Sequence, residues 1–229
     1  MLKTKEIILK YIRMVRKVMV KKVLCEVMLD CVVLTKPKEV KTYGIEVIYA
    51  VDVEFQSTKT KKGVININYS NSLGLELKPG DNLRIKGDLR SIRVDSSELG
   101  VEVKEDSTEP VIKPRKVYLL IREIEKLDKL PEDMLNVINF ENLLVTSKPV
   151  TRKSYTDDTM DITSFKVRSE RNKDKSSVLF CTAWNSLARL TADMEVGVRI
   201  TGQGNLQSRY SHDWLYNEIC ISSLSIEEG

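Results

Sequence analysis

The sequence predicts an all-β protein with two five-stranded barrels in tandem and an amphipathic helix at the N-terminus. Two observations predict this fold class. Ten segments rich in Val, Ile and Tyr follow one another along the 229 residues, separated by turn-forming stretches. The last five segments also match the first five residue by residue, as expected of a duplicated domain.

Residues 1–20 have the pattern of an amphipathic helix. Apolar residues recur at spacings of three and four, with cations between them. They are Ile7, Ile8, Tyr11, Ile12, Val15, Val18 and Met19. We expect this helix to pack on the first barrel or on a partner subunit, because a solvated basic face is the usual state of such helices. The segment predicts neither a signal peptide nor a membrane span, since cations interrupt its apolar residues.

Each set of strands has the same order. The first set covers residues 23–35, 45–55, 64–69, 83–91 and 117–124, and the second covers residues 137–146, 159–168, 178–184, 198–208 and 215–226. Residues 186–194 read as a short helix. Five antiparallel strands with a helix between the third and fourth is the order of an OB-fold, whose outer face and loops bind oligonucleotides or oligosaccharides. The predicted domains are residues 21–130 and 131–229.

The internal repeat extends to individual residues. Matched pairs are Leu34 with Val145, Pro37 with Pro149, Tyr43 with Tyr155, Asn71 with Asn185, Gly80 with Gly197, Gly87 with Gly204, Leu89 with Leu206, and Ser91 with Ser208. The spacing within a pair grows along the chain from 111 to 117 residues, as small loop insertions would make it. The first copy also has an acidic insertion at residues 95–109.

The chemistry-bearing residues argue against an enzyme. His212 is the only histidine, and there is no Gly-rich phosphate loop, HExxH or GxSxG pattern. We therefore expect no catalytic residues, no metal and no cofactor. Asp157, Asp158 and Asp161 lack the ligand spacing of a calcium loop and read as solvated turn acids. The four cysteines, Cys25, Cys31, Cys181 and Cys220, form no CxxC pair, so we expect buried free thiols in a cytoplasmic protein.

Residues 178–184 carry the main candidate site. Leu179, Cys181 and Ala183 share one face of the predicted strand, and Phe180 and Trp184 lie on the other. Because the small aliphatic set suits a narrow core, we expect the two rings to point outward, where nucleic-acid bases can stack on them. The reverse assignment, with the rings in the core, stays open from alternation alone.

Charge supports nucleic-acid binding. Residues 1–130 carry a net charge of +7 and residues 131–229 carry −3, but eight of the eleven cations of the second half fall within residues 148–175. The candidate phosphate-binding cations there are Arg152, Lys153, Lys166, Arg168, Arg171, Lys173 and Lys175, beside Lys148.

The first copy differs where the stacking rings should lie. Val64, Asn66, Asn68 and Ser70 replace the outward residues of the second copy, so a stacking surface is missing. Its candidate cations are Lys59, Lys61, Lys62, Lys86 and Arg90, with Arg84 and Arg93 nearby. This copy either binds the phosphates of a nucleic-acid strand or forms a dimer interface, and both interpretations remain open.

The second copy resembles the bacterial single-stranded DNA-binding (SSB) protein family over residues 136–227. The segments Leu179-Phe-Cys-Thr-Ala-Trp-Asn-Ser-Leu-Ala188 and Val198-Arg-Ile-Thr-Gly-Gln-Gly-Asn-Leu-Gln-Ser-Arg209 carry most of the likeness, with residues 147–155 and 165–167. The resemblance implies stacking aromatics at Trp184 and Tyr210 and a DNA-contacting loop at residues 171–175. Tyr155 and Arg209 end matched segments and are candidates on the same ground.

The resemblance implies a function in DNA replication, recombination or repair, with single-stranded DNA or RNA and replication or recombination proteins as partners and no membrane association. Two departures matter. The family usually ends in a flexible tail with an acidic, aromatic tip, which is not found after residue 225. It also usually carries one barrel per chain and assembles four, so a chain with two predicts a homodimer. The alternative is a primosome-like or replication-accessory OB-fold protein that acts mainly through protein contacts.

Overall fold

The computed structural model describes residues 24–94, 115–154, 157–172, 175–211 and 214–227. The helix expected at residues 1–20 and the acidic insertion at residues 95–109 lie outside these ranges. Within them, no helix has the length and apolar character needed to cross a membrane.

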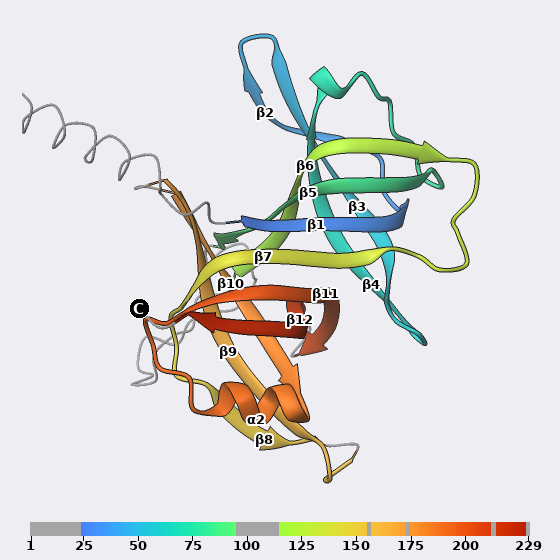
Figure 1. The fold of residues 1–229 in the computed structure, drawn as a ribbon. Coiled ribbons are helices and arrows are strands. Elements are labelled where there is room, and N and C mark those ends of the chain that lie inside the picture. Colours follow the sequence, from blue (N-terminus) through green and yellow to red (C-terminus); the bar gives the residue numbers. More distant parts are fainter. Residues whose placement is uncertain (1–23, 95–114, 155–156, 173–174, 212–213, 228–229) are drawn as a thin grey trace, which may run out of the picture.

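The first half contains a closed five-stranded barrel. Its strands are β1 (Leu24–Val33), β3 (Glu46–Thr58), β4 (Lys61–Ser70), β5 (Asn82–Arg93) and β6 (Arg115–Leu127). They pair in the order β3-β4-β6-β5-β1, and β1 closes the barrel by pairing with β3 as well as β5. All five strands expected from the sequence are present (Figure 1).

The second half repeats this arrangement. Its strands are β7 (Asn136–Val145), β9 (Asp161–Asn172), β10 (Lys175–Trp184), β11 (Arg199–Ser211) and β12 (Trp214–Glu227). They pair in the order β7-β11-β12-β10-β9, and contacts between β7 and β9 close the barrel. The helix α2 (Ser186–Ala192) follows β10 as expected.

The structure corrects the expected element list in two places. Each half has an extra short strand, β2 (Lys38–Tyr43) and β8 (Val150–Lys153), and together these form the two edges of the sheet. Their residues are all exposed, so no apolar alternation marked them. The helix expected between the third and fourth strands of the first copy is only a 3-10 turn, η1 (Asn71–Leu73), which ends at Gly74 with a φ of 67°.

Two matched glycines show how closely the halves agree. Gly87 and Gly204 sit at equivalent β-bulges, in the pairings of β5 with β6 and of β11 with β12. A Cβ atom at either position would lie 2.5 Å from a backbone carbonyl oxygen of the neighbouring strand, that of Leu120 or Cys220. Both bulges therefore require glycine, and the sequence repeat is a structural repeat.

The two barrels are joined edge to edge. Strand β1 pairs antiparallel with β7, which makes one sheet of twelve strands (Figure 1). Side chains of both barrels add hydrogen bonds, among them those of Ser91 and Ser208. The Ser91 hydroxyl donates to the carbonyl oxygen of Val178 at 2.7 Å and accepts from the Val178 N–H at 3.0 Å. The Ser208 hydroxyl donates to the Val64 carbonyl oxygen at 3.3 Å. We call this set of contacts the barrel seam.

Candidate nucleic-acid interface

Strand β10 points its two aromatic rings away from the barrel core. Leu179, Cys181 and Ala183 are at most 1% exposed, whereas Phe180 and Trp184 are half-buried on the opposite face. The orientation expected from the sequence is confirmed, and the reverse assignment is wrong. The aliphatic side chains of this strand therefore fill the barrel beside the buried rings of Phe140 and Phe165 from neighbouring strands.

The Trp184 side chain lies near the thiol of Cys220 on β12. Burial and the charge of Glu218 raise the pKa of Cys220 to about 11, and the nearby Trp184 side chain opposes this rise. Cys220 is half-buried, so the expectation that all four thiols are buried is wrong at this residue.

Cations of β9 lie beside the Phe180 ring. Lys166 is directly opposite Phe180, and its ammonium nitrogen lies 5.4 Å from the ring centroid. Arg168 lies opposite Val178 and forms an ion pair of 2.9 Å with Glu170. Charge and aromatic surface therefore alternate across two neighbouring strands.

A buried hydroxyl lies between the two rings. Thr182 is 4% exposed, and its Oγ1 has no hydrogen-bond partner among the residues that the structure describes. A buried polar atom without a partner costs about 1–3 kcal/mol, so such atoms often mark positions where a ligand or water supplies the bond.

A second cation and ring extend the site onto β11 and β12. The Arg209 guanidinium lies 5.7 Å from the centroid of the Tyr216 ring, and it also pairs with Glu218 at 3.3 Å. Tyr216 was missed in the sequence because its neighbours do not alternate: Leu215 is half-buried and residues 217–219 are all buried. We call Lys166, Arg168, Phe180, Trp184, Arg209 and Tyr216 the aromatic face.

Other predicted site residues of this barrel lie at its rim or outside the described part. Arg152, Lys153 and Lys175 are exposed. Lys153 pairs with Asp161 at 2.7 Å, so its charge is partly balanced. Tyr155 and Lys173 fall outside the described residues, as do the side chains of Arg171 and Tyr210. The turn acids serve local structure: Asp157 accepts from the hydroxyl of Thr159 at 2.6 Å.

The first barrel presents a polar outer face, as expected. Asn66 and Asn68 are half-buried on β4, and the Asn66 amide donates to Asp52 at 2.9 Å. One ring was missed: Tyr118 of β6 lies opposite Asn66 and is half-buried. The first barrel therefore has a single tyrosine where the second has a phenylalanine and a tryptophan on one strand.

Most candidate cations of the first barrel are already in ion pairs. Lys62 pairs with Glu54 at 2.5 Å, and Arg90 pairs with Asp88 at 3.3 Å. Lys86 lies 3.6 Å from Glu26 and 3.9 Å from Glu123. Lys59 and Lys61 are exposed at the turn between β3 and β4. The paired cations attract phosphate less strongly than the formal charge of this half indicates.

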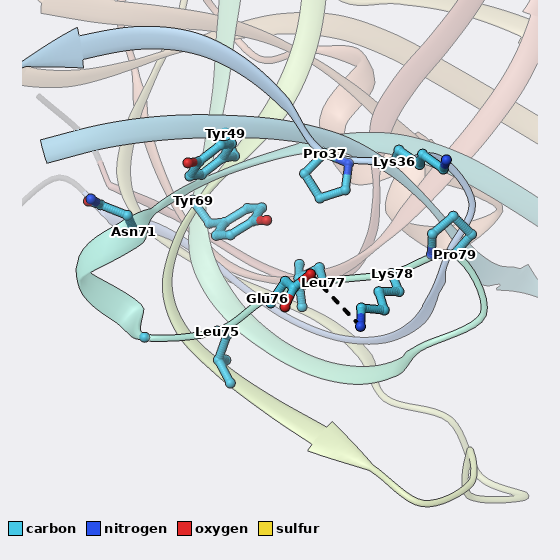
Figure 2. Close-up of a pocket in the computed structure, with 11 residues that line it drawn as sticks. Lys36, Pro37, Tyr49, Tyr69, Asn71, Leu75, Glu76, Leu77, Lys78 and Pro79 are labelled. Carbon is cyan, nitrogen blue, oxygen red and sulfur yellow. Dashed lines mark ion pairs between the residues drawn. The ribbon is translucent and has the colours of Figure 1, made fainter.

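The first barrel is also open at one end. A cavity of about 770 Å³ opens beside the turn η1, with Asn71 and Gly74 in its lining (Figure 2). Its lining includes Tyr49 and Tyr69, whose ring centroids are 5.7 Å apart, with Leu75, Leu77 and Lys36. Burial raises the pKa of Tyr69.

Comparison with solved structures identifies the fold. No protein family model matches the chain, and no curated protein matches it. The crystal structure of the single-stranded DNA binding protein from Thermus aquaticus superposes with a TM-score of 0.65 at 15% identity, covering 91% of this chain and 95% of that one. A deletion mutant of the same protein gives the same score and identity, with 91% and 96% covered. The N-terminal domain of PriB from Thermoanaerobacter tencongensis covers 45% of this chain and 97% of its own, at 20% identity and a TM-score of 0.34. The chain thus has the tandem OB fold of the Thermus aquaticus single-stranded DNA binding protein.

Proposed function

We propose that this chain binds single-stranded DNA on the aromatic face of its second barrel. One observation carries the proposal: Phe180 and Trp184 point outward from one strand of a small barrel, with cations on the strands around them. Half-buried rings on an outer barrel face need a reason to be there, and base stacking provides one.

The chemistry of the face suits a single strand. Each base stacked on an aromatic side chain contributes about 1–3 kcal/mol, and every base has a π-face, so binding tolerates any sequence. Lys166 and Arg168 lie close enough to the rings to contact the phosphates of a stacked strand. Arg152, Lys153, Arg171, Lys173 and Lys175 would extend this contact at the rim.

The two barrels then have unequal roles. We assign residues 131–229 to the stacking barrel and residues 21–130 to a barrel that supports the strand with Lys59, Lys61 and Tyr118. The likeness to a single-stranded DNA binding protein supports single-stranded DNA binding through the shared fold. The protein would act without catalysis, as a homodimer in the cytoplasm, during DNA replication, recombination or repair.

Intrinsic fluorescence tests the proposal, because the chain has only two tryptophans. Stacking of oligo(dT) on Trp184 should quench a large share of the emission. A Trp184→Phe variant, which leaves only Trp214, should bind with similar affinity but lose most of the quenching. Parallel titrations with oligo(U) test whether the protein also binds RNA. Titrations with duplex DNA test whether it prefers single strands to duplexes. No quenching and no binding of oligo(dT) at low salt would contradict the proposal and favour a protein-interaction module.

A further inference from the structure

Two arginines face each other at the end of the first barrel that meets the second. Arg93 at the end of β5 lies directly opposite Arg115 at the start of β6. Arg93 is exposed and Arg115 is half-buried. Among the residues that the structure describes, no carboxylate pairs with either side chain. Burial and the charge of Arg93 both lower the pKa of Arg115.

Stability does not account for this pair. Like charges directly opposite on neighbouring strands destabilise a sheet. The fold does not require them either, because the equivalent pair in the second half is Tyr210 opposite Leu215. Residues that break a local rule without a structural gain are commonly found at functional sites.

The arginine pair lies next to the aromatic face. The Arg115 guanidinium donates to the Ser91 hydroxyl at 3.4 Å, and Ser91 in turn bonds Val178 of β10 across the barrel seam. Val178 precedes Phe180 by two residues and points to the same face of β10. Arg168 lies opposite Val178 on the other side. Cations of both barrels therefore converge on the start of the strand that carries the stacking rings.

We propose that Arg93 and Arg115 bind backbone phosphate of the same single strand whose bases stack on Phe180 and Trp184. The binding site is then composite: the second barrel supplies the rings, and the first supplies an anion-binding pair across the seam. Bound phosphate would also relieve the repulsion between the two guanidinium groups. This inference rests on the proposed function, since it assigns the path of the same strand.

The test is the salt dependence of oligo(dT) binding in a double variant, Arg93→Gln with Arg115→Gln. Loss of two phosphate contacts should flatten the log-log slope by about 1.4, at roughly 0.7 for each neutralised phosphate on a single strand. The matched control is Lys36→Gln with Lys78→Gln, which removes the same charge at the opposite end of the first barrel and should leave the slope nearly unchanged. The double variant should be at least as stable to heat as the unmodified protein, because repulsion is removed.

The outcomes separate this inference from the proposed function. If Trp184→Ala weakens binding while the double arginine variant keeps the original slope and affinity, the seam does not contact the strand and only this inference fails. If neither variant changes binding, the proposed site itself is wrong. Equal flattening by the double arginine variant and the lysine control would show a general charge effect and would also overturn the inference. The single variant Arg93→Gln, at an exposed position, repeats the test should the double variant fold poorly.

Discussion

Val27 of β1 lies directly opposite Ile138 of β7. The two residues are 111 positions apart, which is also the spacing of Leu34 and Val145 in the sequence repeat. Equivalent residues of the two barrels thus meet at the centre of the antiparallel pairing, as they do across the two-fold axis of a symmetric dimer. The chain holds within itself an interface of the kind that two identical subunits form.

The hydrogen bonds of the seam follow the same approximate symmetry and give a first prediction. Ser91→Ala should lower the free energy of unfolding by about 1–3 kcal/mol, because both backbone groups of Val178 lose the hydroxyl that they share. Urea denaturation measures this loss. Ser72→Ala, at an exposed position in η1, is the control and should change stability by less. Equal effects would show that the Ser91 bonds contribute little to joining the barrels.

The second prediction compares equivalent positions on the two outer faces. Trp184→Ala should weaken oligo(dT) binding by about 1–3 kcal/mol, the contribution of one stacked base. Ser70→Ala, at the matching position of the first barrel, should leave affinity nearly unchanged. Fluorescence anisotropy of a labelled oligonucleotide measures both. Similar losses from the two changes would mean that the barrels bind equally.

Much of this arrangement could be predicted from the sequence, for physical reasons. The β10 alternation of small aliphatic and large aromatic residues was informative because the two sets lie on opposite faces of a strand, and only one face of a barrel strand lines the core. Strands β2 and β8 were missed because edge strands that are exposed on both faces carry no alternation. Tyr118 was overlooked although it alternates with buried Val117 and Leu119 in the same way. Tyr216 carries no such signal, because residues 217–219 are all buried. The seam could not be foreseen, since the edge that β1 offers to β7 depends on how each barrel closes.

Ion pairing is a further property that the sequence does not reveal. Lys62, Lys86 and Lys153 read as free cations, yet each lies within 3.6 Å of a carboxylate from another strand or turn. Such pairs form between side chains that the pairing register of neighbouring strands places side by side, and this register cannot be read from the sequence. The candidate site is therefore less evenly basic than the count of lysines and arginines indicates.

The third prediction concerns salt and the loop between β9 and β10, with the strand cations beside it. Replacing Arg171, Lys173 and Lys175 together with Gln should flatten the dependence of log affinity on log salt, by about 0.7 for each phosphate contact that is lost. Titrations at four or more salt concentrations measure the slope. A slope that stays the same would show that this loop is solvated surface and takes no part in binding.

The fourth prediction is a loss of stability at high pH. Burial raises the pKa of Cys25 and of Cys31 from 9.0 to about 12. Above pH 9 the unfolded chain loses these protons while the folded chain keeps them. The free energy of the unfolded state therefore falls relative to that of the folded state. Stability should therefore be fully present below pH 9 and fall toward pH 12, by about 1.4 kcal/mol per pH unit for each thiol. A Cys25→Ala, Cys31→Ala variant should show a shallower decline in denaturation experiments at pH 8 to 11, and a decline of equal steepness would contradict the assignment.

The last prediction concerns assembly. Among the strands that the structure describes, β2 forms one edge of the sheet and pairs only with β3, and unpaired edges recruit further strands. Apolar side chains are exposed around this edge: Val40 and Tyr43 are 53% and 56% exposed, and Ile45 is 96% exposed. A second copy would cover them and bring the number of barrels to four.

Light scattering at micromolar concentration distinguishes a dimer from a monomer. A mass near 52 kDa, twice the 26.2 kDa of the chain, is expected for the unmodified protein. Ile45→Lys should shift the mass toward 26 kDa, because a charge placed in the contact must be desolvated without a partner. Ile92→Lys is the matched control, since Ile92 is 50% exposed on β5, away from the β2 edge, and it should leave the dimer intact. A mass near 26 kDa for the unmodified protein, persisting with bound oligonucleotide, would show that the two barrels of one chain suffice.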